Sequence, residues 1–262
     1  MRANPAIMPT LILGALLFAA GAACGRRYLR LACAFGVVLA LPCLLAVFYY
    51  THLFDNAAWF YEARSLPFFE ITFAGIGFLG GAVHQWHAPA TWKEWVAVPL
   101  VTAAFVLIPF IKPILDPLDL DALQDRCSGE VCLQSSLSSC GPASAATILR
   151  SFGQRVTERD LAAESFTYHG GTEAWYLARA LRRRGYRANF VFSESSLPHP
   201  AIAGVRLRGG AGHFIAVLNV SGSDVRIVDP MSGPVTMPMN KLRDAYRFTG
   251  FFMKVAPQQG VP

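Results

Sequence analysis

The chain has 262 residues, of which 53% are hydrophobic and only 15% are charged, and its formal net charge is +6. Soluble domains carry roughly 25% charged residues, so the composition excludes a protein that is soluble over its whole length. The apolar excess lies in the amino-terminal part, where four long stretches contain no charged residue: 3–25, 31–54, 71–92 and 95–111.

These uncharged stretches predict a membrane domain over residues 1–115. A helix needs about 20 mainly apolar residues to cross a bilayer core. The pattern therefore predicts an all-α bundle of about four transmembrane helices, near residues 7–24, 31–53, 66–83 and 95–115. The first could instead be a cleaved signal peptide, but Gly21 stands where lipoprotein sites usually have leucine, so we favour a retained helix. Glu70, inside the third span and near its end, is expected to reach water.

Charges and cysteines indicate the orientation in the membrane. Arg26, Arg27 and Arg30 follow the first span, and such clusters mark cytoplasmic loops. With four spans, the carboxy-terminal domain then lies on the outer (periplasmic) side of an inner (cytoplasmic) membrane. Cys127 and Cys132 form a close pair that suits a disulfide. Disulfides persist in oxidising compartments, which supports the same side.

A short acidic linker, residues 116–124, separates the apolar part from a domain over residues 125–262. This domain holds 16 basic and 10 acidic residues, and the difference is the whole net charge of +6. Its densest basic patch, an arginine cluster within residues 182–187, is expected to be a solvated helix face. Nothing besides the charge itself points to nucleic acid.

Periodicity and capping residues predict helices followed by strands in this domain. We expect helices at residues 141–152, 157–164 and 172–184. Strand-like runs follow at residues 186–192, 202–207, 213–220, 225–228 and 250–255. Thr157 and Thr172 are expected to cap the second and third helices. Helices followed by a strand-rich half indicate an α+β domain with an antiparallel sheet.

Cys140 is the first candidate for chemistry, because it lies at the start of the helix predicted at 141–152. Pro142 fits a first helical turn, where its missing N–H costs nothing. Backbone N–H groups and the positive end of the helix dipole favour a thiolate there, and the thiolate is the nucleophilic form. The alternative is that Cys140 is a small buried hydrophobic residue.

His213 and Asp229 form the second candidate pair. His213 opens one strand of a predicted hairpin and Asp229 ends the other, so that a carboxylate is available to orient an imidazole. Side chains alternate faces along a strand. A three-residue loop would make the two residues diagonal neighbours on one face, whereas a two-residue loop would separate them. The sequence allows either. A cysteine, a base and an orienting carboxylate are the parts of a thiol acyl-transfer site.

At this point a resemblance to a known family is visible. Residues 125–255 resemble the bacteriocin-processing cysteine peptidases, papain-like domains that cut leader peptides after a double glycine and are often fused to ABC exporters. The matching features, in chain order, are Gln134 six residues before Cys140, the helix start Cys140-Gly141-Pro142-Ala143, the loop Gly171-Thr172, and the runs Gly212-His213-Phe214, Val228-Asp229-Pro230 and Phe248-Thr249-Gly250.

The resemblance implies a role for each candidate. Cys140 is implied to be the nucleophile, His213 the base and Asp229 the residue that orients it. Gln134 is implied to be the side-chain donor to the oxyanion. Two departures matter. The membrane part here precedes the peptidase-like domain, and the chain has no phosphate-binding loop of the ATP-driven exporters.

Two functions therefore follow from the sequence. The first is a membrane-anchored cysteine endopeptidase that hydrolyses a peptide bond in a small secreted precursor or leader peptide. The second is a peptidase-like module that binds a peptide for a secretion or assembly system without cutting it. We favour the enzyme, because the cysteine and the histidine are both present. Expected partners are the peptide substrate, the lipid bilayer and a separate export system. No cofactor and no metal site is expected, since Cys127 and Cys132 alone are too few zinc ligands.

Overall fold

The structure is a computed structural model that describes residues 4–87, 91–193 and 195–258. The chain folds into two compact units. Unit 1 holds Asn56–Leu66 and the chain from Leu115 onward, and unit 2 holds Ala3–Asp55 and Pro67–Ile114. The short segment Asn56–Leu66 thus belongs to unit 1, although it lies in sequence between helices of unit 2.

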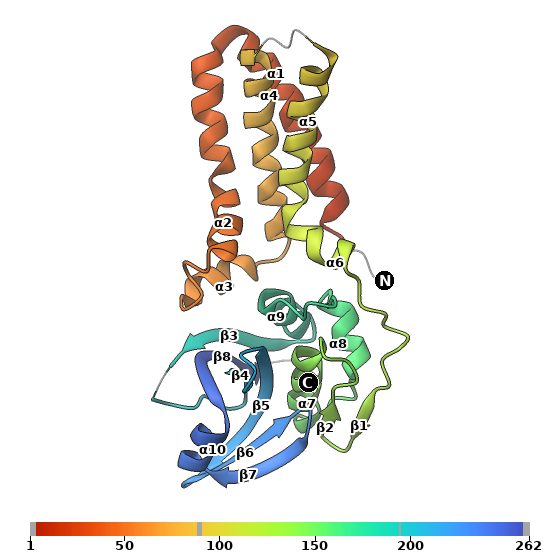
Figure 1. Ribbon diagram of the computed structural model, residues 1–262, viewed down its shortest axis with the longest axis vertical. Coiled ribbons are helices and arrows are strands. Elements are labelled where there is room, and N and C mark those ends of the chain that lie inside the picture. The colour runs from red at the N-terminus through yellow and green to blue at the C-terminus, as the bar shows by residue number, and fades with distance from the viewer. Residues whose placement is uncertain (1–3, 88–90, 194, 259–262) are drawn as a thin grey trace. The chain divides into compact units, whose positions relative to one another are not determined.

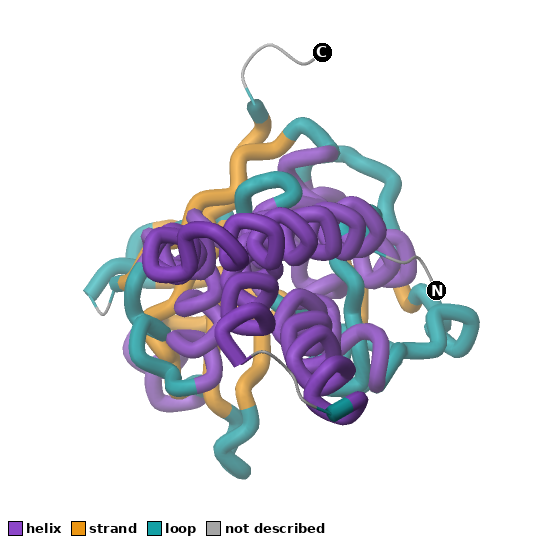
Figure 2. The backbone as a smooth tube through the Cα atoms, turned by 90° about the horizontal axis from the view of Figure 1, so that it is seen from above, coloured by secondary structure: helices purple, strands orange, loops and turns teal. Residues whose placement is uncertain are grey.

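Unit 2 is helical (Figure 2). Its helices are α1 (Ile7–Ala40), η1 (Leu41–Cys43), α2 (Leu44–Tyr50), η2 (Phe69–Ala74), α4 (Gly75–His87), α5 (Trp92–Leu107) and η3 (Ile108–Phe110), and α6 (Ile111–Leu115) ends at its boundary. Non-helical backbone angles at Tyr28 divide α1 into two arms (Figure 1). Gly21 and Gly36, one in each arm, lie against α4 so closely that a Cβ on Gly21 would be 2.0 Å from the Phe78 carbonyl oxygen. Glycine therefore permits the close packing of this bundle.

Among the described residues, two helices are long and apolar enough to cross a membrane, Ile7–Tyr50 and Trp95–Leu115. A third candidate is the pair Ala58–Arg64 and Phe69–Trp86, which is bent by 85°. The described part of the chain thus supports two or three candidate spans where the sequence predicted about four. The first helix contains the predicted span 7–24 and all but the last three residues of the predicted span 31–53. The expectation that Glu70 reaches water is wrong, because its side chain is buried in unit 2 with 2% exposure.

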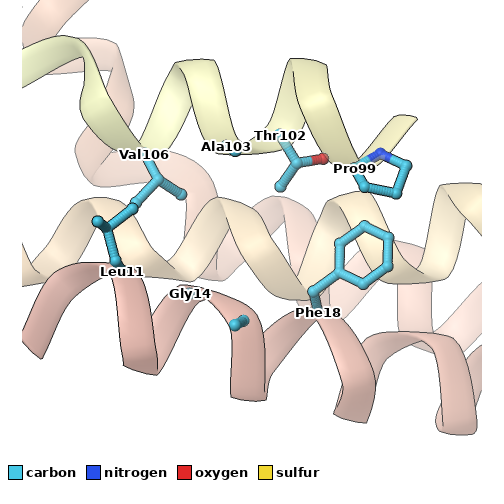
Figure 3. Close-up of a pocket in the computed structure, with 8 residues that line it drawn as sticks. Leu11, Gly14, Phe18, Pro99, Thr102, Ala103 and Val106 are labelled. Atoms are coloured by element: carbon cyan, nitrogen blue, oxygen red, sulfur yellow. The ribbon is translucent and has the colours of Figure 1, made fainter. Parts of the chain in front are cut away.

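An apolar pocket of about 290 Å³ lies between α1 and α5 (Figure 3). Leu11 and Phe18 from α1 face Pro99, Thr102 and Val106 from α5 across it. Thr102 carries the one hydroxyl among these five side chains, and this hydroxyl donates to the Val98 carbonyl at 2.8 Å. The pocket therefore presents almost only hydrocarbon, as expected for helices that pack in an apolar surrounding.

Unit 1 is built on a six-stranded antiparallel sheet of order β3-β8-β4-β5-β6-β7. The strands are β3 (Tyr186–Phe192), β4 (Ala201–Arg206), β5 (Gly212–Ser221), β6 (Asp224–Asp229), β7 (Gly233–Pro238) and β8 (Arg247–Pro257). The helices are α7 (Cys140–Ser151), α8 (Glu158–Glu164), α9 (Ala174–Arg183) and α10 (Met239–Ala245). Alternate strand residues point to opposite faces, so one face packs against α7, α8 and α9 and the other against α10. The predicted α+β domain with an antiparallel sheet is confirmed.

A small hairpin precedes α7. Its strands β1 (Arg126–Ser128) and β2 (Val131–Leu133) pair antiparallel and place Cys127 opposite Cys132. These two cysteines form a disulfide, which the sequence allowed but did not settle. Cys132 is fully buried, and its N–H donates to Thr147 Oγ1 of α7 at 3.0 Å. The hairpin is thereby fastened to the helix that begins with Cys140.

Helix α3 (Ala58–Arg64), the helix of the segment Asn56–Leu66, packs on the edge of this sheet. Glu62 Oε1 accepts a hydrogen bond from the Phe190 N–H at 2.9 Å, and its Oε2 accepts from Arg182 at 2.6 Å. The Tyr61 ring lies 5.3 Å from the rings of both Phe190 and Phe251. Because β3 is an edge strand, Glu62 of α3 satisfies a backbone donor, the Phe190 N–H, that has no partner strand on that side.

The structure corrects several details of the sequence prediction. Thr157 caps α8 with a capping box, as predicted. Thr172 does not cap α9, which begins at Ala174 after Glu173. The arginine cluster is not simply solvated, since Arg182 pairs with Glu62 and Arg184 pairs with Glu164 at 2.7 Å. The strands β1, β2 and β7 and helix α10 were not predicted, because each is short and has little periodicity.

Candidate active site

Cys140 is the first residue of α7, as the sequence predicted within one residue. The helix is buried from Gly141 to Leu149, so its start is fixed against the sheet. A Cβ on Gly141 would lie 3.4 Å from the Phe214 ring, and Ser144 Oγ donates to the Phe214 carbonyl at 3.1 Å. These contacts bring the half-buried Cys140 to the strand that carries His213.

His213 and Asp229 meet in the structure. His213 Nε2 lies 2.9 Å from Asp229 Oδ1, and the two residues are only 5% and 6% exposed. Since Asp229 occupies Nε2, the other ring nitrogen, Nδ1, is left to face the cysteine. Burial alone would lower the pKa of His213, but the hydrogen bonds with Asp229 and with Cys140 outweigh it and raise the pKa to about 9.

The register of the hairpin explains how this pair forms. Ser221 pairs with Asp224, so the loop has only two residues, which by itself would separate the pair. A β-bulge between Val217 and Asn219 shifts the register by one residue. The shifted register places His213 and Asp229 as diagonal neighbours on one face. The bulge therefore does what a three-residue loop would have done.

Asp229 accepts three hydrogen bonds. Its Oδ1 accepts hydrogen bonds from the His213 ring and from the Met231 N–H, each at 2.9 Å. Its Oδ2 accepts one from the Tyr246 hydroxyl at 2.9 Å. Burial would raise the pKa of Asp229, but these donors and the charge of His213 lower it, so the carboxylate stays ionised. Tyr246 was missed by the sequence analysis, because it follows the unpredicted helix α10 and belongs to no motif.

Gln134 lies in the loop before Cys140. Its N–H donates to the Pro230 carbonyl at 2.8 Å, which ties this loop to the residue after Asp229. Its side-chain Nε2 donates to the Ser136 carbonyl at 2.8 Å, and its buried Oε1 has no hydrogen-bond partner among the described residues. An amide nitrogen carries two N–H groups, so one remains for a further acceptor.

Two exposed apolar side chains lie close in sequence to Cys140 and Asp229. Leu137, three residues before Cys140, is 88% exposed, and Met231, two residues after Asp229, is 50% exposed. Large exposed apolar side chains commonly mark binding surfaces when they gather at one site. Among the described residues, no group of three or more His, Cys, Asp or Glu residues is placed to hold a metal ion.

Known proteins are similar to this part of the chain. The sequence model of the Peptidase C39 family matches residues 129–260. An uncharacterised protein of Methanothermobacter marburgensis is 38% identical over 103 residues, which are 39% of this chain and 72% of that protein. The lactococcin-G-processing and transport ATP-binding protein of Lactococcus lactis is 24% identical over 135 residues, 49% of this chain and 19% of that protein.

A solved structure is also similar to part of this chain. The chain is similar to a double glycine motif protease from an AMS/PCAT transporter, solved in complex with its leader peptide. The identity is 24%, the TM-score is 0.43, and the match covers 49% of this chain and 91% of that one. The match of the family model over half of the chain, together with the relative from Methanothermobacter marburgensis, shows that the chain belongs to the Peptidase C39 family.

Proposed function

We propose that the chain is a membrane-anchored cysteine endopeptidase that hydrolyses a peptide bond in a small secreted precursor or leader peptide. The observation that carries this proposal is the buried His213–Asp229 pair, whose free ring nitrogen faces a cysteine at the start of a helix. In this proposal Cys140 is the nucleophile, His213 the acid and base, and Asp229 the residue that orients the imidazole.

The geometry supports a defined order of steps. In this proposal the reactive form of the site is a thiolate–imidazolium pair of Cys140 and His213, because the thiolate is the nucleophile. The thiolate attacks the carbonyl carbon, and the carbonyl oxygen becomes an oxyanion. His213 then gives its proton to the leaving amine as the C–N bond breaks, which leaves a thioester. Water attacks the thioester with His213 as base, the C–S bond breaks, the carboxylic acid product leaves, and the thiolate–imidazolium pair returns.

The oxyanion needs donors that are already in place. The Cys140 N–H lies at the start of α7, where it has no helical carbonyl to bond. We propose Gln134 as the second donor, through the N–H of Nε2 that Ser136 leaves free. The Oε1 of the same amide is buried without a partner among the described residues, so the present orientation of the amide leaves an acceptor unsatisfied.

We also propose that residues 1–115 anchor the protein in a membrane, joined by the linker 116–124 to the peptidase domain at 125–262. The Cys127–Cys132 disulfide supports a place for that domain on the outer face. Loss of this disulfide in cells, together with a carboxy-terminal reporter that is active only in the cytoplasm, would contradict this orientation.

The enzyme can be tested without knowing its substrate. The purified full chain in detergent is incubated with a peptide library made from a digested proteome, and new termini are identified by mass spectrometry. We expect cleavages with wild-type protein that are absent with Cys140→Ala. Peptides retained equally by both proteins, with no new termini from either, would indicate the non-cleaving peptide-binding module instead.

A further inference from the structure

We propose that Tyr246 is a positioning residue, which holds the Asp229 carboxylate in the orientation that serves His213. This inference rests on the proposed function, because it assigns a role within the same site. Its basis is a hydrogen bond from the Tyr246 hydroxyl to Asp229 Oδ2 at 2.9 Å, on the oxygen that His213 does not use.

The first argument concerns the freedom of the carboxylate. A carboxylate rotates about its Cβ–Cγ bond, and this rotation would move Oδ1 away from the imidazole. The Met231 N–H and the His213 ring both bond Oδ1, so neither fixes the opposite oxygen. Among the described residues, only Tyr246 donates a hydrogen bond to Oδ2. Removal of its hydroxyl therefore leaves one end of the carboxylate unheld.

The second argument concerns how firmly Tyr246 itself is held. It directly follows α10, and its N–H donates to the Leu242 carbonyl at 2.9 Å. Leu242 is fully buried in the core between α10 and the sheet, where the Tyr246 ring also packs. The side chains of His213 and Asp229 lie on the same face of the sheet as α10. The phenol thus reaches the carboxylate from a rigid element that is separate from the hairpin.

The third argument concerns the state of the phenol. Burial and the nearby charge of Asp229 raise the pKa of Tyr246 to about 12. Tyr246 therefore remains a neutral donor over the whole pH range in which the site would work. A hydrogen bond to an ionised acceptor is also stronger than one between neutral groups.

The test compares Tyr246→Phe with Tyr186→Phe in the full chain. Tyr246→Phe removes only the hydroxyl and keeps the ring in its core. Tyr186 is the control, because its ring also packs against a hydrophobic core, and it lies on β3 and bonds Gln154 instead of the active-site residues. Gel filtration and titration of the Cys140 thiol count the folded protein, so that every rate refers to intact sites.

Two readouts are measured. The first is hydrolysis of a fluorogenic peptide that ends in Gly-Gly-aminomethylcoumarin. We expect Tyr246→Phe to lower kcat about tenfold with little change in KM, since positioning acts on the transition state. The second is the midpoint of an NMR titration of His213 in labelled protein. We expect this midpoint to fall by about half a pH unit, because a poorly held carboxylate stabilises the imidazolium less.

The pathway of the effect is tested in an Asp229→Ala background. There Tyr246 has no carboxylate to hold, so the added Tyr246→Phe change should cost little more. Equal losses in both backgrounds, or rates and midpoints like those of Tyr186→Phe, would overturn the inference. If the wild type cleaves neither the coumarin peptide nor the peptide library, the proposed function fails, and the His213 midpoints alone decide the role of Tyr246.

Discussion

The raised pKa of His213 gives a prediction that needs no substrate. Its imidazolium should persist to about pH 9 in the wild-type protein. The hydrogen bond with Asp229 is the largest of the effects that raise this pKa, and burial opposes them. Asp229→Asn removes the carboxylate charge, so the pKa should fall towards the ordinary 6.5 or below it. Cys140→Ala should lower it as well, because the cysteine contributes the remaining raising effects.

The size of the change follows from the two pKa values. At pH 8, a group with a pKa of about 9 is about 90% protonated, whereas one at about 6.5 is about 3% protonated. The imidazolium is lost as the pH rises through the pKa of His213 in the folded protein. The variants, in which this pKa is lower, therefore lose the imidazolium at a lower pH. Activity should therefore decline above about pH 9 in the wild type, and at lower pH in Asp229→Asn.

The measurement is an NMR titration of isotopically labelled histidine in the full chain in detergent. The chain has six histidines, so the His213 signal is assigned by its absence from His213→Gln. His199, which contacts the Leu197 carbonyl and not the active-site residues, serves as an internal control. A wild-type midpoint near 6.5, or a midpoint that does not move in Asp229→Asn, would refute this account of the site.

Three further predictions follow. Cys140→Ala should abolish cleavage while the midpoint of thermal unfolding stays within a few degrees of wild type; wild-type turnover by this variant would exclude it as the nucleophile. Gln134→Ala should lower kcat about a hundredfold, roughly 3 kcal/mol, at nearly constant KM, and a loss seen only in KM would show that Gln134 is not the oxyanion donor. Glu62→Ala leaves the Phe190 N–H without its acceptor and should speed its hydrogen exchange, as measured by mass spectrometry on β3, by about tenfold. Glu130→Ala, which removes a surface partner of Arg226, should leave that exchange unchanged, and equal rates in both variants would contradict the role of Glu62.

The sequence by itself determined the features that local patterns control. Cys140 could be placed at a helix start because Pro142 and the helix-forming residues after it are local signals. The α+β character followed from the order of helical and strand-like runs. The Cys127–Cys132 disulfide was allowed by a spacing of five residues, which a tight hairpin closes without help from the rest of the chain.

Only the tertiary structure decided how distant parts meet. The hairpin loop has two residues, and the bulge at Leu218, which no local pattern marks, sets the register that joins His213 to Asp229. Tyr246 reaches Asp229 because α10 packs on the same face of the sheet, and that packing depends on burial of Leu242. The pKa of His213 likewise depends on groups that only the fold brings together.

The division into units shows the same limit. Glu62 and Arg64 set α3 apart from the uncharged stretches on either side of it, but no local pattern assigns α3 to unit 1. Its place in unit 1 comes from contacts more than a hundred residues away in the chain, with Arg182 and the edge strand β3. Local sequence patterns report periodicity and caps over a few turns. They do not report which edge strand needs a partner, because that need arises only once the sheet has formed.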